Sequence, residues 1–317
     1  MGVVIVYGQR SDAHVLSVIE ALETRQREYV LFERFRHGYR LSYEFVTNKS
    51  QVLIHTPQKV YDLASDIDGI YWRHTAVNNA EKGLIHQSTY RDILRSSEWG
   101  EASRALSLQE EIKIKHVNPV SREIIVSNKI YQLILAKRNG LRIPNSFVSN
   151  DKVGVQGFNQ VNKPLIIKSL APMFDERTDG GIPTELYNPF EAVEGEIAFS
   201  PKIYQPYIEK AYELRVIVVD SKIFTVKINS QNHADTEIDW RKAAYHKDLF
   251  EEGELSFDTS RRLLNFHKNA GIIYAAYDFI VDTEGVEYFL ECNPHGNWLF
   301  LNCYLKEIGL AIVDYFS

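Results

Sequence analysis

The sequence predicts an α/β domain at the N-terminus, followed by two smaller α+β units. Strand and helix patterns alternate over the first 115 residues, which is typical of a parallel sheet. From residue 203 onward, short strand patterns follow one another, as in an antiparallel sheet. The chain has 317 residues, of which 44% are hydrophobic and 25% charged, and this is enough for two or three packed units.

The N-terminal domain is predicted to span residues 1–115. Its first stretch, "GVVIVYG", is apolar but lacks the basic flank and cleavage site of a signal peptide, so we expect a buried strand. No run of residues approaches the length of a membrane span. In chain order, the expected elements are a strand at residues 2–8, a helix at 11–26, strands at 28–34 and 66–74, and a helix at 88–111.

The two α+β units are predicted at residues 116–202 and 203–317. One helix is expected over residues 121–140, with Ser121 as its N-cap and Gly140 as its C-terminal stop. The motifs "VDSK" and "VDTEG" are typical of hairpin turns. Strands are expected at residues 142–150, 162–170, 202–210, 212–220, 222–230, 275–282 and 285–293, and helices at 258–271 and within 297–316.

The net charge and the cysteines argue against several functions. A formal net charge of −6 provides no general attraction to nucleic acid or to anionic membranes. Cys292 and Cys303, the two cysteines of the sequence, have no metal-ligand or redox spacing, so we expect reduced thiols rather than a disulfide. A cytoplasmic location is expected.

An acidic cluster is predicted where the last two strands pair. Glu291 and Asn293 lie two residues apart in "FLECNPHGNW", so alternation directs both side chains to one face. If the hairpin through Thr283 and Glu284 has a two-residue loop, Asp278 lies diagonal to Glu291 on that face, whereas one more loop residue would turn Asp278 away. Hard oxygen donors suit Mg²⁺, which binds through one or two carboxylates and substrate phosphates. The alternative is a polar strand end with unrelated acids.

Two upstream lysines are candidates for binding phosphate. Lys168 follows apolar residues in "PLIIKSL", where an ammonium group is costly to bury without an anion. Lys129 lies on the apolar-patterned helix before it. The segment at residues 169–184, "SLAPMFDERTDGGIPT", could fold over a triphosphate and donate backbone N–H groups. The alternatives are a lysine whose head reaches solvent and an ordinary surface loop.

A charged stripe is predicted beside the acidic cluster. In "ELRVIVV", alternation places Glu213, Arg215 and Ile217 on one face of a strand. Lys227 interrupts the apolar pattern of the next strand, and Arg215 with Lys227 would hold a phosphate across a metal ion. The alternative is a solvated sheet face with cross-strand ion pairs.

The order of these motifs resembles the ATP-grasp fold, in which two α+β subdomains enclose ATP. The resemblance covers about residue 116 to the C-terminus, and the N-terminal α/β domain would be Rossmann-like. Within this superfamily, "YWRHTA", "ELRVIVVDSKIFTVKINSQ" and "DWRKAAYH" resemble the graspetide (microviridin-type) macrocyclising ligases. Two residues depart from the pattern, since Pro206 stands where many relatives have an acid and His74 where many have arginine. The matching motifs are Lys129, Lys168, "YQPYI", "ELR", Lys227, "YDFIVD" and "LECNPHG".

The resemblance implies a role for each matching position. Arg215, Arg241 and Lys227 would form the catalytic set, in which the two arginines stabilise the transferred phosphate and the acyl phosphate. The ATP phosphates would be bound by Lys129 and Lys168, adenine by the backbone around Gln205, Tyr207 and Ile208, ribose by Glu213, and two Mg²⁺ by Asp278, Glu291 and Asn293.

The function that the resemblance implies is an ATP-dependent, ADP-forming carboxylate–amine or carboxylate–alcohol ligase. Side-chain carboxylates of a ribosomal precursor peptide would become acyl phosphates, and a hydroxyl or amine of the same peptide would close an ester or amide cross-link. The expected partner is a peptide with a leader and an acidic, hydroxyl- or lysine-bearing core, and the basic residues of "DWRK" and "KIN" would face that core. A homo-oligomer, dimer or tetramer, is expected.

Three alternatives stay open. One is an ATP-grasp ligase that joins separate molecules, adding an amino acid to a peptide or small molecule. Another is a nucleotide-binding regulator without ligase activity, against which the full set of Asp278, Glu291 and Asn293 argues. The last is a sheet protein that binds no nucleotide.

Overall fold

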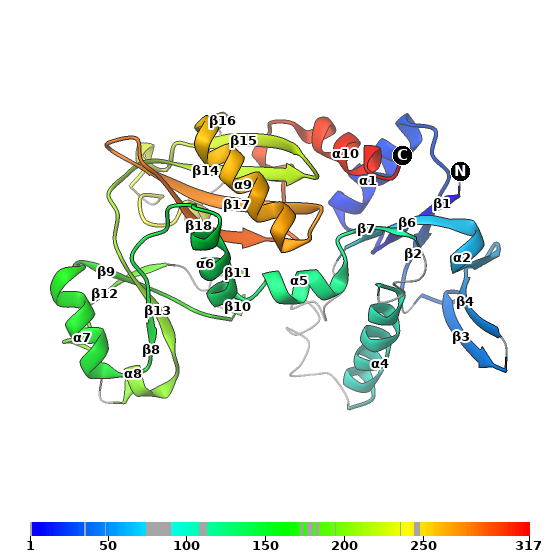
Figure 1. Ribbon diagram of the computed structural model, residues 1–317, viewed down its shortest axis with the longest axis horizontal. Helices are drawn as coiled ribbons and strands as arrows, with labels where there is room; N and C mark the ends of the chain where they lie inside the picture. Colours follow the sequence, from blue (N-terminus) through cyan, green and yellow to red (C-terminus); the bar gives the residue numbers. More distant parts are fainter. Residues whose placement is uncertain are drawn as a thin grey trace.

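Three parts, each built on its own main β-sheet, make up the chain in the computed structural model (Figure 1). Within the described residues, no helix is both long enough and apolar enough to cross a lipid bilayer. The structure describes residues 2–34, 36–47, 49–73, 90–107, 113–171, 174–175, 180–181, 184–193, 195–234, 236–243 and 248–317.

The N-terminal part is a four-stranded parallel sheet in the order β2-β1-β6-β7, as the alternating pattern predicts. Every residue of β1 is buried, and Asp12 caps the following helix by accepting the backbone N–H of His14. Strand β7 extends this sheet to Val117, past the boundary predicted at residue 115, because it pairs with β6. The elements are β1 Val3–Tyr7, α1 Ala13–Thr24, β2 Tyr29–Phe32, β6 Ile67–Trp72, α4 Tyr90–Ser107 and β7 Lys115–Val117.

A small antiparallel sheet, which the sequence interpretation missed, is inserted between β2 and β6. It projects from the N-terminal part at the lower right of Figure 1. The alternation of apolar and polar residues in "RLSYEFV" is the signal that could have indicated it. Its elements are β3 Arg40–Val46, β4 Lys49–His55, β5 Val60–Asp62 and the short helix α2 Leu63–Asp66.

The single helix predicted over residues 121–140 is wrong, because two helices form instead. Helix α5 covers Val120–Val126, and α6 covers Lys129–Arg138. Asn128 starts the second helix by accepting the Tyr131 N–H at 3.0 Å, whereas the predicted cap Ser121 lies inside α5. Gly140, at φ +75°, ends the segment as predicted. The break leaves Lys129 as the first residue of a helix that packs on β18.

The central part is a four-stranded sheet in the order β12-β9-β13-β8. Leu165, Ile167 and Tyr204 pack with residues of α7, so Ile166 and Lys168 occupy the other face of the sheet. Strand β13 continues to Pro206, so the predicted boundary between residues 202 and 203 falls within a strand. The elements are β8 Phe147–Ser149, α7 Lys152–Val161, β9 Leu165–Lys168, β10 Phe174–Asp175, β11 Gly180–Gly181, β12 Glu185–Tyr187, α8 Glu196–Phe199 and β13 Lys202–Pro206.

The C-terminal part is a five-stranded antiparallel sheet in the order β16-β15-β14-β17-β18. Helix α9 covers one face, where it packs on Leu214, Val216 and Val218. Both cysteines are free, as predicted. The elements are β14 Lys210–Val219, β15 Lys222–Ile228, η1 Ser230–Asn232, η2 Trp240–Ala243, β16 Phe250–Glu252, α9 Phe257–Ala270, β17 Tyr274–Asp282, β18 Glu287–Asn293, η3 Leu299–Leu301 and α10 Leu305–Asp314.

The last helix joins the C-terminal part to the N-terminal part. Helix α10 returns to pack on α1 (Figure 1), and Ile217 of β14 shares one buried cluster with Leu22 of α1 and Ile312 of α10. Burial of this apolar surface fixes the first and third parts against each other.

Candidate functional site

A cavity of about 860 Å³ lies between the central sheet, the C-terminal sheet and helices α5 and α6. Two of the residues predicted for the site, Arg215 and Lys227, are not among those that line it. Ten of the predicted residues line it, namely Lys129, Lys168, Gln205, Tyr207, Ile208, Glu213, Arg241, Asp278, Glu291 and Asn293.

The acids Asp278 and Glu291 lie directly opposite each other on β17 and β18. The two-residue loop assumed for this hairpin is wrong, because Thr283, Glu284 and Gly285 all lie between the paired residues at its ends. A three-residue loop would place Leu290 opposite Asp278. A β-bulge at Leu290 shifts the register by one residue and returns Glu291 to the face of Asp278.

The segment after β18 fixes the end of this strand. Asn293 lines the cavity, and its Oδ1 accepts the His295 N–H at 3.0 Å. Gly296 is required here because a Cβ would come within 2.2 Å of the Ala276 Cβ and 2.7 Å of the Arg215 Nη2. The strand ends at Asn293, and the absence of a side chain at Gly296 leaves room for the Arg215 guanidinium.

Opposite charges surround the two acids. Arg215 is 6% exposed, and its Nη1 donates to both carboxylate oxygens of Asp278 at 2.8 and 3.0 Å. The Lys129 Nζ lies 3.5 Å from the Glu291 Oε2. Burial, reinforced by Glu291 and partly offset by Arg215, raises the pKa of Asp278. Burial opposes ionisation of Glu291 as well, but Lys129 and Lys168 hold its pKa below the ordinary value.

The predicted charged stripe of Arg215 and Lys227 is wrong. Lys227 pairs with Leu214, and residues paired across antiparallel strands share a face, so Lys227 lies on the face opposite to Arg215. Its Nζ contacts Glu251 at 2.8 Å and lies 4.9 Å from the centroid of the Tyr212 ring. Lys227 therefore does not face the cavity, and the basic residue of "KIN" is not placed to meet a peptide there.

Lys168 and Gln205 face the cavity from the central sheet. Burial lowers the pKa of Lys168 to about 8, despite the attraction of Glu291. Gln205 is 2% exposed and donates to the Ser146 Oγ at 2.8 Å, while its Oε1 has no hydrogen-bond partner among the described residues. The Tyr207 N–H already donates to the Pro164 carbonyl at 2.7 Å, so this group is not available to a bound base.

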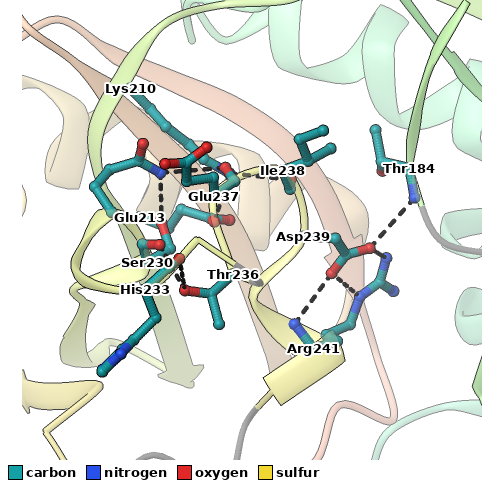
Figure 2. Close-up of polar contacts among 11 residues, drawn as sticks. Thr184, Lys210, Glu213, Ser230, His233, Thr236, Glu237, Ile238, Asp239 and Arg241 are labelled. Carbon is teal, nitrogen blue, oxygen red and sulfur yellow. Dashed lines mark hydrogen bonds and ion pairs between the residues drawn. The ribbon is translucent and has the colours of Figure 1, made fainter.

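Arg241 is held by an acid that the sequence interpretation did not select. The Arg241 Nε and Nη2 donate to Asp239 at 2.8 and 2.5 Å, and Asp239 also accepts the Thr184 N–H at 3.3 Å (Figure 2). Thr184 precedes β12 of the central sheet, so Asp239 joins the two walls of the cavity. The side-on pair uses Nε and one N–H of Nη2, so Nη1 and the second N–H of Nη2 can donate to an anion.

The segment that carries Asp239 is anchored by a buried ion pair. Lys210 donates to Glu213 at 2.7 Å and to the Ile238 carbonyl at 3.1 Å, as Figure 2 shows. Thr236 donates to the Ser230 carbonyl at 2.6 Å. Glu213, the residue assigned to ribose, is thus 7% exposed and already paired. The spacing of Asp239 and Arg241 in "DWR" was the signal that could have indicated this pair in the sequence.

No protein-family model matches the sequence, and no match is found among curated proteins. Solved structures, in contrast, are similar over the full length. A Chryseobacterium gregarium RiPP-associated ATP-grasp ligase, in complex with ADP and a leader and core peptide, is 23% identical, with a TM-score of 0.84 over 99% of this chain and 96% of that chain. The fold is an ATP-grasp fold.

Two further structures support this fold. The macrocyclase MdnC of Microcystis aeruginosa MRC, bound with precursor peptide MdnA, is 22% identical, with a TM-score of 0.79 over 100% of this chain and 99% of that chain. The D-cycloserine synthetase DcsG is 12% identical, with a TM-score of 0.58 over 100% of both chains. The ATP-grasp fold that the motifs of Lys129, Lys168 and "LECNPHG" predict is confirmed.

The residues of this ATP-grasp cleft fit Mg²⁺ and a phosphate chain. Among the described residues, no group of three or more His, Cys, Asp or Glu side chains could hold a metal ion unaided. Asp278, Glu291 and Asn293 offer three hard oxygens, and Mg²⁺ is usually bound by one or two carboxylates together with substrate phosphates. The mutual repulsion of the two carboxylates is a further reason for a cation to bind between them.

Two predicted features lie outside the described residues. His74 of "YWRHTA" is one. Half of the segment at residues 169–184, expected to fold over a triphosphate, is the other. Its described residues include Ser169, Ala171 and Thr184, all of which line the cavity.

Proposed function

We propose that this chain is an ATP-dependent, ADP-forming ligase that activates side-chain carboxylates of a ribosomal precursor peptide and closes ester or amide cross-links within it. The observation that carries the proposal is the position of Asp278, Glu291 and Asn293, opposite Lys129, Lys168 and Arg241, in one ATP-grasp cleft. The full-length similarity to a macrocyclase bound with its precursor peptide supports the peptide as substrate.

The first step is phosphoryl transfer from ATP to a carboxylate. An oxygen of the peptide carboxylate forms a bond to the γ-phosphorus, the bond from that phosphorus to the β,γ-bridging oxygen breaks, and ADP leaves. Mg²⁺ bound by Asp278, Glu291 and Asn293 would neutralise charge on the transferring group. Lys129 and Lys168 bind the phosphates. Arg215, which does not line the cavity, holds Asp278 in place and does not contact the phosphate.

The second step is attack on the acyl phosphate. A hydroxyl or amine of the same peptide forms the new bond to the carbonyl carbon, phosphate leaves, and the nucleophile loses its proton. Because nucleophile and acyl phosphate belong to one bound chain, positioning supplies a large share of the rate. The N–H groups of Arg241 that do not contact Asp239 stabilise the carboxylate and the acyl phosphate.

Lys168 gives this proposal a test by nucleotide binding. Lys168→Met is expected to weaken ADP binding about 10- to 100-fold, because a charge-assisted hydrogen bond contributes about 1.5–3 kcal/mol. The pKa of Lys168 is about 8, and a bound anion raises it, so wild-type protein should take up protons on binding ADP at pH 8.5. Binding should weaken as the pH rises above 8, since the neutral amine no longer attracts phosphate. Calorimetric titration in two buffers of different ionisation enthalpy measures both the affinity and the uptake.

Lys163→Met is the matched control, because Lys163 is an exposed lysine just before the same strand. It should leave both the affinity and the proton uptake unchanged. An unaltered dissociation constant in Lys168→Met would make Lys168 a structural lysine.

Mass spectrometry of the peptide tests the reaction itself. A candidate acid-rich peptide, incubated with the protein, ATP and Mg²⁺, should lose the mass of one water for each cross-link. A gain in mass would indicate a ligase that adds a separate molecule, and an unchanged mass would favour a nucleotide-binding regulator. The homo-oligomer and the cytoplasmic location stay predictions, the former open to sedimentation analysis.

A further inference from the structure

A side chain provides hydrogen-bond partners for the backbone of β18. This strand is the edge of its sheet, so outward-facing backbone groups require partners other than a neighbouring strand. At Cys292, between Glu291 and Asn293, the Gln132 Oε1 accepts the backbone N–H at 3.0 Å and the Gln132 Nε2 donates to the carbonyl at 2.7 Å. The amide of Gln132 thus takes the place of a paired strand at this one residue.

Gln132 is itself fixed in orientation. It is 3% exposed, and its Nε2 also donates to the Val126 carbonyl, at the end of α5, at 2.7 Å. It lies on α6 three residues after Lys129, which faces Glu291. One turn of α6 therefore carries both Lys129, whose ammonium group faces Glu291, and Gln132, whose amide holds the backbone of β18.

The Gln132 amide lies next to the β-bulge that directs Glu291 into the cleft. Before the bulge, the Phe289 N–H donates to the Arg142 carbonyl at 2.8 Å, and after it Gln132 holds Cys292. Without the bulge, Glu291 would lie opposite Tyr277, whose ring is buried under α9. Leu290, the extra residue, is thus enclosed between two fixed points.

We propose that Gln132 is a positioning residue that fixes the bulged end of β18, so that Glu291 and Asn293 present their oxygens to one divalent cation. The role rests on the proposed function, because that cation accompanies the nucleotide. Residues that orient metal ligands without touching the metal typically change metal affinity by about 10- to 100-fold when they are replaced. Gln132 does so through the backbone rather than through the ligand side chains.

The test is Gln132→Met. Methionine has a side chain of similar length and is also a good helix former, but it cannot make the three hydrogen bonds of the Gln132 amide. Mn²⁺ binding in the presence of ADP, followed by electron paramagnetic resonance, should weaken about tenfold. ADP binding without metal should stay within about twofold. In metal-free protein, hydrogen exchange should quicken in the peptide that contains residues 287–293 and not in the other strands.

Leu22→Ala is the stability control, because Leu22 lies in the buried cluster that joins α1 and α10 to the C-terminal sheet, and this cluster includes no residue of β18. It should lower thermal stability without changing Mn²⁺ affinity or exchange in β18. If Gln132→Met does not fold, Gln132→Glu keeps the acceptor for Cys292 N–H and loses the donors, and the same losses are expected.

Unchanged Mn²⁺ affinity in a folded Gln132 variant would overturn the proposal, as would equal losses in Leu22→Ala. Wild-type protein that binds no Mn²⁺ with ADP would instead overturn the proposed function, and with it the metal-positioning role. The metal-free exchange rates would then still show whether Gln132 holds the strand.

Discussion

Glu291→Gln is expected to reduce ATP-dependent product formation by about 1,000-fold while the protein stays folded. The change keeps the size of the side chain and removes the charge that faces both Lys129 and the expected cation. A bound metal ion contributes several kcal/mol to phosphoryl transfer, and each 1.36 kcal/mol corresponds to a factor of ten in rate. Because the pKa of Glu291 is held below its ordinary value, the wild-type side chain is ionised at neutral pH.

Glu284→Gln is the matched control, since Glu284 lies exposed in the turn of the same hairpin. It should retain full activity, and both variants should show wild-type circular dichroism and thermal melting. Near-normal turnover of Glu291→Gln at saturating Mg²⁺ would remove Glu291 from the metal site.

Asp278→Asn should lose turnover as well, but it is a less clean test. Arg215 is buried and donates to both oxygens of Asp278, so the variant leaves a buried guanidinium without its counter-charge. Removing one partner of a buried ion pair costs about 3–5 kcal/mol. The loss of activity in this variant would therefore combine the loss of a metal ligand with a loss of stability.

Arg241→Ala is expected to lower product formation about 100-fold and to leave ADP affinity almost unchanged. The expectation follows from the cost of removing one donor that stabilises a developing oxyanion. Asp239 holds the guanidinium through Nε and Nη2, so Nη1 and the second N–H of Nη2 can contact a substrate in the cleft. Arg241→Lys should restore little, because lysine cannot contact Asp239 and a substrate carboxylate in the same planar arrangement.

Arg261→Ala, which changes an exposed arginine of α9, is the control for loss of positive charge. ADP affinity and product yield are measured on the same preparations. Full product formation by Arg241→Ala would show that Arg241 does not act in acyl transfer, and so would an equal loss of ADP binding.

Patterns within one strand predicted the faces of the site correctly. Alternation in "ELRVIVV" placed Glu213 and Arg215 on one face, and the structure has them there. The sequence placed Asp278 diagonal to Glu291 on one face from a loop of the wrong length; the shared face holds because the bulge at Leu290 offsets the extra loop residue, and the two acids are directly paired. Leucine is not a residue type that indicates a β-bulge, so the bulge at Leu290 could not be predicted from the sequence.

Relations between neighbouring strands and helices were harder to predict than the strands themselves. The side on which Lys227 lies depends on the register with β14, which is set by pairing along the whole hairpin rather than by the residues near Lys227. The break at Ser127 and Asn128 lies within a continuous helical pattern, and it forms because Asn128 caps α6. The role of Gln132 likewise has no sequence pattern, since two of its three hydrogen bonds are made with the backbone of a distant strand.

The central claim is that a peptide carboxylate becomes an acyl phosphate in this cleft, and an oxygen label tests it directly. The acid-rich peptide, with ¹⁸O in both oxygens of its side-chain carboxylates, is incubated with ATP and Mg²⁺. Phosphate, nucleotide and peptide are then analysed by mass spectrometry. The account predicts ADP, phosphate that carries one ¹⁸O for each cross-link, and a cross-linked carbonyl that retains the other. Unlabelled phosphate, or label in AMP, would contradict it.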